Sequence, residues 1–267
     1  MGKNKRSLFF ILLFVVFLLI GFSNAYDRKK QTDIMKEKVE ELKEVKEEIT
    51  LENNGSGEDE IVSDKPILAE YKDIYQENKD FIGWLSIPGT AIDYPVMQKP
   101  DDNEYYLNHD FDHNENINGA LMLDKANNIE EDTNLIIHGH NMKSGEMFGG
   151  LDLFMDEEYL KERPIINFDS LYEKRSYKII AVIHSQVYKK SDDVFKYYHY
   201  TGANSQEEFD EFRDFVKNNN LIENKVDMEY GDEFITLSTC AYHVENGRLV
   251  IVGGLTPNNS DNLEKHP

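Results

Sequence analysis

The first 26 residues are dominated by one uninterrupted apolar run. Residues 8–22, LFFILLFVVFLLIGF, contain no charged or polar side chain. With the uncharged residues that flank it, the run reaches about 20 positions, which is close to what a tilted helix needs to cross a bilayer. The pattern therefore predicts a membrane-anchoring helix within residues 1–26. The alternative is a cleaved signal peptide, because Ser23-Asn24-Ala25 has the small residues of a cleavage site.

Basic residues lie just before the apolar run, at Lys3, Lys5 and Arg6. By the positive-inside rule, the N-terminus then stays in the cytoplasm and the rest of the chain is exported. A retained anchor would make the protein a single-pass protein of the cell membrane. With either an anchor or a signal peptide, we expect the functional domain to be extracellular.

Residues 27–65 form the next segment, and in residues 27–52 Lys and Glu alternate. Their apolar side chains are spaced 4, 3, 3 and 4 positions apart, which predicts a helix with a narrow apolar stripe. The stripe consists of Met35, Val39, Leu42, Val45 and Ile49. A charged helical spacer is favoured over a coiled-coil seam because the segment is short. Residues 53–60, NNGSGEDE, predict a flexible linker that completes the spacer.

From residue 66 onward, short apolar runs are separated by Gly, Pro, Asn and Asp. Residues 66–78 predict a short helix, and eight later runs predict strands. These runs are Phe81–Ile87, Ala91–Met97, Ala120–Leu123, Asn134–His138, Ile165–Phe168, Tyr177–Ser185, Glu233–Thr239 and Arg248–Leu255. Many short strands with turn residues between them indicate a mainly β domain, either a closed barrel or a sandwich.

A second amphipathic helix interrupts the strands at residues 205–219, SQEEFDEFRDFVKNN. It begins with Ser205 three residues before Glu208, which is the spacing of a capping box. Its aromatic face is expected to pack on the β domain and to have no catalytic role. The organisation is therefore a domain of residues 66–257, preceded by the anchor and spacer and followed by a tail of residues 258–267.

The net charge of the predicted domain limits the kinds of molecule that it can bind. The first 26 residues carry +3 and residues 27–65 carry −5, so the remaining residues carry −20 of the total of −22. Nucleic-acid binding needs a basic face that neutralises phosphates, and this domain has the opposite charge. An acidic domain suits a cationic, amine-bearing partner, although acidity also serves solubility.

Cys240 is the one cysteine of the chain, so no internal disulfide can form. A lone cysteine is either a buried small hydrophobe or a reactive thiol. Here it ends a predicted buried strand, and a second strand begins near Arg248. If the two strands are antiparallel neighbours, Cys240 and Arg248 face each other. A guanidinium favours the nucleophilic thiolate and can donate hydrogen bonds to an oxyanion. The alternative for Arg248 alone is an ordinary surface residue.

A cysteine nucleophile also needs a group that transfers protons, which is usually histidine. The segment NLIIHGHNM offers two candidates among eight histidines. Gly139 ends the predicted strand and places His140 at its exposed end, whereas His138 still belongs to the strand and shares a face with Ile136. We expect His140 to be the acid/base and His138 to line the wall of the site, although spacing alone decides weakly between them.

The sequence contains no complete motif for binding a metal ion or a cofactor. Residues 110–119, DFDHNENING, are rich in oxygen ligands, but Glu115 and Leu121 replace the Gly and Glu that a calcium loop needs. There is no CxxC or HExxH pair and no glycine-rich phosphate loop. We therefore expect no metal site and no cofactor.

Several motifs together resemble the class B sortases. TLSTC followed eight residues later by Arg248 resembles the active-site signature of the family, and LIIHGHNM resembles the strand that carries its histidine. The similarity extends over about residues 70–255 and includes FIGWLSIPGTAIDYPVMQ, NEYYLNHDF, NGALMLD, MFGGL and the helix-bearing insertion at 205–219.

This resemblance implies a closed eight-stranded β-barrel with peripheral helices, behind the transmembrane helix and the charged spacer. It implies Cys240 as nucleophile, His140 as acid/base and Arg248 as the group that stabilises the oxyanion. Ser238, and with it Thr239, would contact substrate. Two positions depart from relatives: Ala241 stands where a groove Glu can occur, and His138 stands where Tyr is frequent.

The resemblance also implies the reaction. A secreted protein with an NPxTx-like sorting motif near its C-terminus would be cleaved after Thr through a thioacyl-enzyme, and then joined to an amine of a peptidoglycan precursor or a pilin lysine. One alternative is a secreted cysteine peptidase that acts on cell-wall peptides. The common peptidase of that kind places Cys before His in the chain, which is the opposite order to His140 and Cys240. The other alternative is a non-catalytic, membrane-tethered binding barrel.

Overall fold

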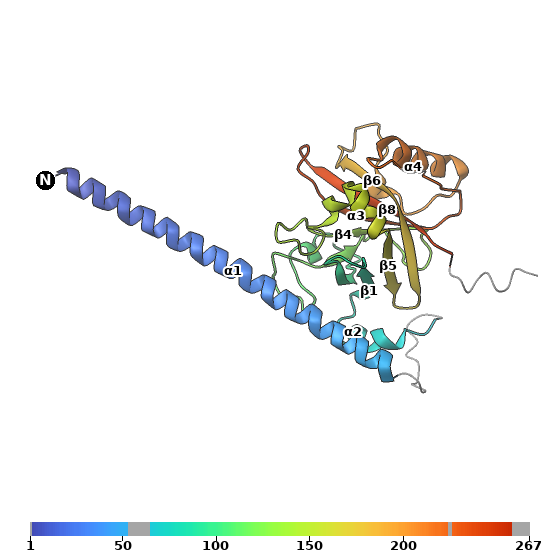
Figure 1. The fold of residues 1–267 in the computed structure, drawn as a ribbon, viewed down its shortest axis with the longest axis horizontal. Helices are drawn as coiled ribbons and strands as arrows, with labels where there is room; N and C mark the ends of the chain where they lie inside the picture. Colours follow the sequence, from blue (N-terminus) through green and yellow to red (C-terminus); the bar gives the residue numbers. More distant parts are fainter. Residues whose placement is uncertain (1, 53–64, 224–225, 258–267) are drawn as a thin grey trace, which may run out of the picture.

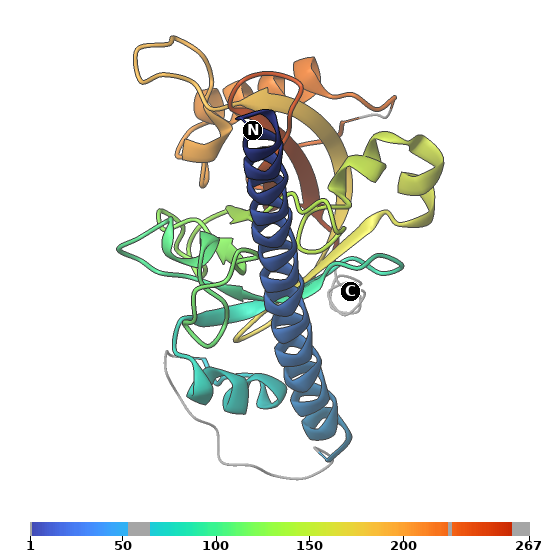
Figure 2. The same cartoon turned by 90° about the vertical axis from the view of Figure 1, so that its left-hand side faces the viewer.

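The computed structural model describes residues 2–52, 65–223 and 226–257. The predicted linker at 53–60 and the tail at 258–267 lie outside the described residues. Helix α1 (Gly2–Glu52) runs without a break through the predicted anchor and most of the predicted spacer. Its N-terminal half projects away from the rest of the molecule, while its C-terminal half lies along the β domain (Figures 1 and 2).

The projecting half of α1 has the character of a membrane span. Its side chains are exposed from Phe9 to Phe22 and are apolar, apart from Gly21. The segment is long and apolar enough to cross a bilayer. The sequence pattern and the structure thus agree on an apolar N-terminal helix.

The spacer part of α1 is helical as expected, but it does not stand free of the domain. Met35, Val39 and Leu42 are at most 8% exposed, because the apolar stripe packs against the barrel. Leu42 joins a cluster that contains Tyr71 and Trp84. The helical spacing of the stripe was predicted correctly. The surface that buries the stripe is formed by residues far from it in the sequence. This part of α1, expected as a free spacer, is therefore packed into the domain.

A short helical segment leads from α1 into the barrel. The predicted helix at 66–78 is formed as a 3-10 turn, η1 (Ala69–Tyr71), followed by α2 (Lys72–Glu77). Ile67, Tyr71 and Ile74 are buried on the side that faces α1 and the barrel. The short helix expected at 66–78 is therefore present, and its buried face joins α1 to the barrel.

Within the described residues, eight strands close into a barrel in the order β1-β2-β3-β4-β7-β8-β6-β5. The strands are β1 (Phe81–Ser86), β2 (Asp93–Met97), β3 (Leu121–Leu123), β4 (Asn134–His138), β5 (Ile165–Ser170), β6 (Lys174–Gln186), β7 (Phe234–Cys240) and β8 (Gly247–Leu255). The pairs β2–β3 and β4–β7 are parallel, and the other six are antiparallel. The closed eight-stranded barrel is confirmed over the sandwich.

Alternation along β7 separates the barrel interior from the functional face. Ile235 and Leu237 pack in the main core of the barrel, while Phe234 packs in an outer cluster with helix α4. Because strand side chains alternate with a period of two, Ser238 and Cys240 follow Phe234 onto the outer face. The nucleophile candidate is thus held on the outside of the barrel, at the end of a buried strand.

Helix α4 (Gln206–Asn219) covers the outer face of β6, β7 and β8. Its N-cap is Ser205, whose side chain accepts a hydrogen bond from the Glu208 backbone N–H at 3.2 Å. Glu208 in turn accepts from the Asn204 backbone N–H, one residue earlier than in a standard capping box. The remaining helical segments are η2 (Tyr105–Leu107), η3 (Leu151–Met155), α3 (Glu157–Glu162) and η4 (Tyr197–His199).

Candidate active site

Cys240 and Arg248 are direct partners across the antiparallel β7–β8 ladder. They form its last pair, at the point where β7 leaves the barrel. Partners in an antiparallel ladder project to the same face, so the thiol and the guanidinium are neighbours. The arrangement expected from the sequence is present. Both side chains are half-buried, and the Arg248 Nη1 donates to the carbonyl of Gly247 at 3.0 Å.

His140 lies just beyond the end of β4, as the glycine before it predicted. The Gly139 N–H donates to Ser238 on β7 at 3.2 Å, which extends the β4–β7 pairing by one residue. A Cβ at position 139 would lie 2.5 Å from Leu121 and 2.7 Å from Phe148, so only glycine fits this close approach. The chain can therefore turn here and bring His140 to the edge of the site.

The imidazole of His140 is held by a backbone group of another segment. Its Nε2 lies 2.7 Å from the carbonyl oxygen of Leu107 in η2. A carbonyl only accepts, so Nε2 carries the proton, and in the neutral ring Nδ1 is the unprotonated nitrogen. This contact fixes the ring plane and the tautomer of His140.

Two side chains join the His140 turn to the end of β7. The Asn141 Nδ2 donates to the carbonyl of Cys240 at 2.8 Å, and the Thr239 hydroxyl donates to the carbonyl of Gly139 at 2.8 Å. Thr239 is 2% exposed. Its hydroxyl makes this connection, and Thr239 also lines the groove, so its contact with substrate stays a prediction.

A groove of about 750 Å³ brings the candidate residues together. Cys240, His140 and Arg248 all line it, and so do His138, Ser238 and Thr239. One wall comes from the segments around η2 and β3, and the other from the end of β6 and η4. The groove wall also includes Asn103, Glu104, Leu107, Met122, Asp124, Lys125, Ala126, Val187, Tyr197, Tyr198 and His199. The predicted site residues therefore share one surface feature.

Ser238 lies on the groove floor, two residues before Cys240 and on the same face. Its Oγ is 2.8 Å from the hydroxyl of Tyr197, which also lines the groove. Burial raises the pKa of Tyr197 to about 12, so its phenol remains protonated at neutral pH. The pair connects η4 to the floor of the groove.

His138 pairs with a carboxylate that the sequence analysis did not single out. Its Nε2 lies 3.0 Å from Asp124 Oδ2, and Asp124 also accepts from the Ala126 N–H and from Asn103 Nδ2, each at 2.9 Å. Burial by itself works against the charged carboxylate, but these hydrogen bonds outweigh it and lower the pKa of Asp124. His138 is thus a wall residue held by an ionised partner.

The sequence analysis did not identify Leu107, Asp124 and Tyr197, which reach the groove from distant segments. It also did not identify Asn141, which connects the His140 turn to the end of β7. Asn141 belongs to the GHNM motif, and that motif was the one available signal for it. Leu107 acts through its carbonyl, which no side-chain pattern reveals. Over the described ranges, no group of three or more His, Cys, Asp and Glu residues is arranged to hold a metal ion.

Comparison with known proteins places this site in a family. Residues 85–256 match the model of the sortase domain. The chain is 36% identical over 189 residues to sortase B of Listeria monocytogenes, covering 70% of this chain and 74% of the relative. It is 26% identical over 189 residues to sortase B of Staphylococcus aureus, with the same coverage.

Solved structures agree with the sequence comparison. The crystal structure of Bacillus anthracis sortase B in complex with AAEK1 superposes with a TM-score of 0.69 and 25% identity, covering 86% of this chain and 99% of that one. A substrate complex of Staphylococcus aureus sortase B shares the fold, with a TM-score of 0.71 at 23% identity over 85% of this chain and 98% of that one. The barrel, the groove and the matched domain lead to one conclusion: this chain belongs to the sortase family, and its relatives are of class B.

Proposed function

We propose that this sortase uses Cys240 as its nucleophile, His140 as its acid/base and Arg248 as the group that stabilises the oxyanion. The observation that carries the proposal is the Cys240–Arg248 register pair, with His140 at the edge of the same groove. Cys240 is the one thiol of the chain. No other residue of the groove offers a comparable nucleophile beside a cation.

The first half of the reaction forms a thioacyl-enzyme. The Cys240 thiolate attacks the carbonyl carbon of the threonine in the sorting motif, and a C–S bond forms. Electrons of the carbonyl move to its oxygen, where the N–H groups of Arg248 can donate hydrogen bonds. The C–N bond then breaks, and the imidazolium of His140 gives a proton to the leaving nitrogen.

The second half transfers the acyl group to an amine. The acceptor amine attacks the thioacyl carbon and loses a proton to the neutral imidazole of His140. The C–S bond breaks, and Cys240 leaves as a thiolate, which restores the enzyme. Transfer to an amine instead of water requires a shielded thioester.

For the substrate we propose an NPxTx-like motif near the C-terminus of a secreted protein. For the acceptor we propose an amine of a peptidoglycan precursor or a pilin lysine. Ser238 and Thr239 are proposed to contact the motif, because both line the groove next to Cys240. The strongly acidic domain would raise the local concentration of a cationic acceptor.

We also propose that α1 anchors the protein with its barrel outside the cell. Family membership supports this orientation more than charge does, because basic residues flank the apolar run on both sides. They are Lys3, Lys5 and Arg6 before it, and Arg28, Lys29 and Lys30 after it. Protease treatment of intact cells tests the orientation: an extracellular barrel is digested, and an intracellular one survives until the cells are lysed.

The decisive experiment mixes the full-length protein in detergent with an NPQT-containing peptide and an added glycine oligomer, and reads the products by mass spectrometry. The full chain is used because the α1 stripe packs on the barrel. Cys240→Ala is run beside it. Cleavage after Thr with joining to the glycine amine, absent in the variant, supports the transpeptidase.

Two other outcomes would support the alternatives. A hydrolysed product with every amine tried would favour a cysteine peptidase. No cleavage, together with a Cys240 that does not react with thiol reagents at neutral pH, would favour a binding barrel.

A further inference from the structure

The segment that carries His140 is a closed loop, which we call the His140 loop (residues 140–149). The Phe148 N–H donates to the carbonyl of His140 at 3.0 Å, and Asn141 forms a β-bridge with Met147. Met147 has a positive φ of 52°, a conformation that a non-glycine residue adopts only when its surroundings hold it there. Contacts therefore constrain the far side of the loop as well as the side that meets Cys240.

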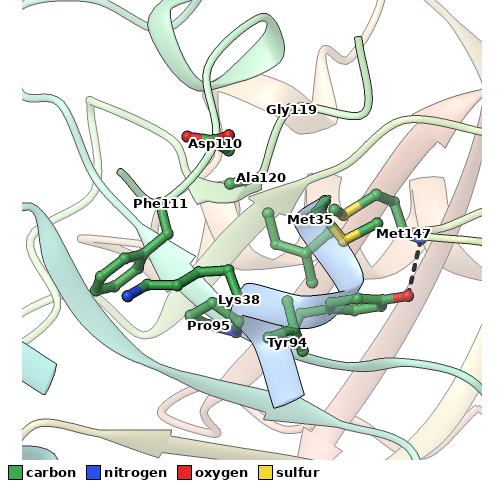
Figure 3. Close-up of a pocket in the computed structure, with 11 residues that line it drawn as sticks. Met35, Lys38, Tyr94, Pro95, Asp110, Phe111, Gly119, Ala120 and Met147 are labelled. Atoms are coloured by element: carbon green, nitrogen blue, oxygen red, sulfur yellow. Dashed lines mark hydrogen bonds between the residues drawn. The ribbon is translucent and has the colours of Figure 1, made fainter. Parts of the chain in front are cut away.

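Helix α1 supplies part of that constraint. The Lys36 Nζ lies 2.5 Å from Glu146 Oε1, and the hydroxyl of Tyr94 on β2 donates to Glu146 Oε2 at 2.9 Å. The Met147 N–H donates to the same Tyr94 hydroxyl at 3.4 Å. Met35, one residue before Lys36, and Met147 both line a small apolar cavity of about 20 Å³ (Figure 3).

The His140 loop is thus held from three directions. Asn141 connects it to the end of β7, and Leu107 receives the imidazole of His140. The third hold, at Glu146 and Met147, comes from the helix that carries the predicted membrane span. We propose that Lys36 and Glu146 are positioning residues, through which α1 sets the placement of His140 relative to Cys240.

The difference in exposure between Lys36 and Glu146 explains why their ion pair influences the position of the His140 loop. The Lys36 side chain is 54% exposed and can be solvated without its partner, whereas the Glu146 side chain is 13% exposed. Among the described residues, a largely buried Glu146 carboxylate without Lys36 would keep only the Tyr94 hydroxyl as a side-chain donor. A buried charge without its counter-ion is unfavourable, and the movement that relieves it is a shift of the loop toward water.

The proposal rests on the proposed acid/base role of His140, and it makes the membrane helix a part of the catalytic unit. A displacement of an acid/base group by a fraction of an ångström lowers the rate of the chemical step more than it lowers binding. The expected signature is therefore a lower kcat at an unchanged KM.

The test compares Lys36→Met with Lys43→Met in the full-length protein in detergent. Lys43 lies on the same helix and pairs at 2.9 Å with Asp93 on β2, which is outside the His140 loop. Each variant therefore loses one ion pair between α1 and the barrel. Lys36→Arg restores the charge. The measurements are hydrogen exchange of residues 140–149 by mass spectrometry, and kcat and KM for transfer of the sorting-motif peptide.

We expect faster exchange in the His140 loop and a kcat lower by about tenfold in Lys36→Met, neither change in Lys43→Met, and recovery in Lys36→Arg. Equal exchange and equal kcat in the Lys36→Met and Lys43→Met variants would overturn the proposal. If the wild-type protein and His140→Ala proved equally inactive, the proposed function would have failed, and the exchange data alone would still decide whether α1 holds the loop.

Discussion

Cys240 and Arg248 are the last register pair of the β7–β8 ladder. Their separation is therefore fixed by backbone hydrogen bonds between two buried strands and is not left to the β7–β8 turn. His140 lacks this advantage, since it follows β4 in a loop whose position depends on contacts with three other segments. The site combines a rigid thiol–guanidinium pair with a histidine that must be held in place.

Two replacements of Arg248 should show how much its positive charge and its planar pair of donors each contribute to the rate. Arg248→Met removes the proposed donor to the oxyanion and should lower kcat by about 10²–10³-fold, which is the usual loss for one such donor. Arg248→Lys keeps the charge but loses the planar pair of donors, and an intermediate loss is expected. Steady-state kinetics with the sorting-motif peptide measures both, and thermal unfolding checks that the fold is intact. A rise in KM alone would assign Arg248 to substrate binding.

Gly139→Ala should disturb the site without touching a catalytic side chain. The new methyl group would lie 2.5 Å from Leu121 and 2.7 Å from Phe148, and the strand end must move to relieve the overlap. We expect a loss of about 1–3 kcal/mol in the free energy of unfolding, together with a lower kcat. Gly150→Ala is the control, because its nearest neighbour would be 4.0 Å away. Equal kinetics in the two variants would show that the turn tolerates displacement.

The contact between α1 and the barrel should contribute strongly to stability. Leu42 is fully buried there, so Leu42→Ala is expected to cost about 2–5 kcal/mol in the free energy of unfolding. Leu51→Ala on the same helix is the matched control, because Leu51 is 81% exposed. Urea unfolding of both variants measures the difference. Similar values for the two would mean that α1 leaves the barrel in solution.

The His138–Asp124 pair should make stability depend on acidic pH. The pKa of Asp124 is lowered in the folded protein, so the ionised carboxylate stabilises the fold above the unfolded-state pKa of about 4. This contribution is lost as the pH falls through the folded-state pKa. We expect a smaller decrease in the free energy of unfolding between pH 5 and pH 3 in Asp124→Asn than in the wild type.

The control for this prediction is Asp152→Asn, since Asp152 is exposed. That variant should retain the wild-type pH dependence. A parallel decline in all three proteins would place the acid sensitivity elsewhere in the molecule.

Much of the fold follows from local pattern. Alternation and turn residues located all eight strands to within a few residues, because strand side chains repeat every two positions and the turns carry Gly, Asn and Asp. The two-residue repeat also predicts that Cys240 and Arg248 project to the same face, provided that β7 and β8 are antiparallel neighbours. The Ser205 cap of α4 is likewise a local feature, formed within four residues.

The partners that complete the groove are separated in the chain by distances that no local pattern spans. Tyr197 meets Ser238 across 41 residues, and Leu107 meets His140 across 33. Asp124 became the partner of His138 only when β3 and β4 paired. For these residues the sequence shows which functional groups are present, but it does not show which groups they contact.

Helix α1 shows most clearly which features follow from local sequence and which depend on tertiary contacts. The spacing of Met35, Val39 and Leu42 determined a helix with one apolar stripe, because the side chains of a helix that recur every three or four positions share a face. Whether that stripe would meet water, another helix or the barrel depended on an apolar surface assembled from distant segments. Burial of that surface is what removes the stripe from solvent, and only the tertiary structure brings the two together.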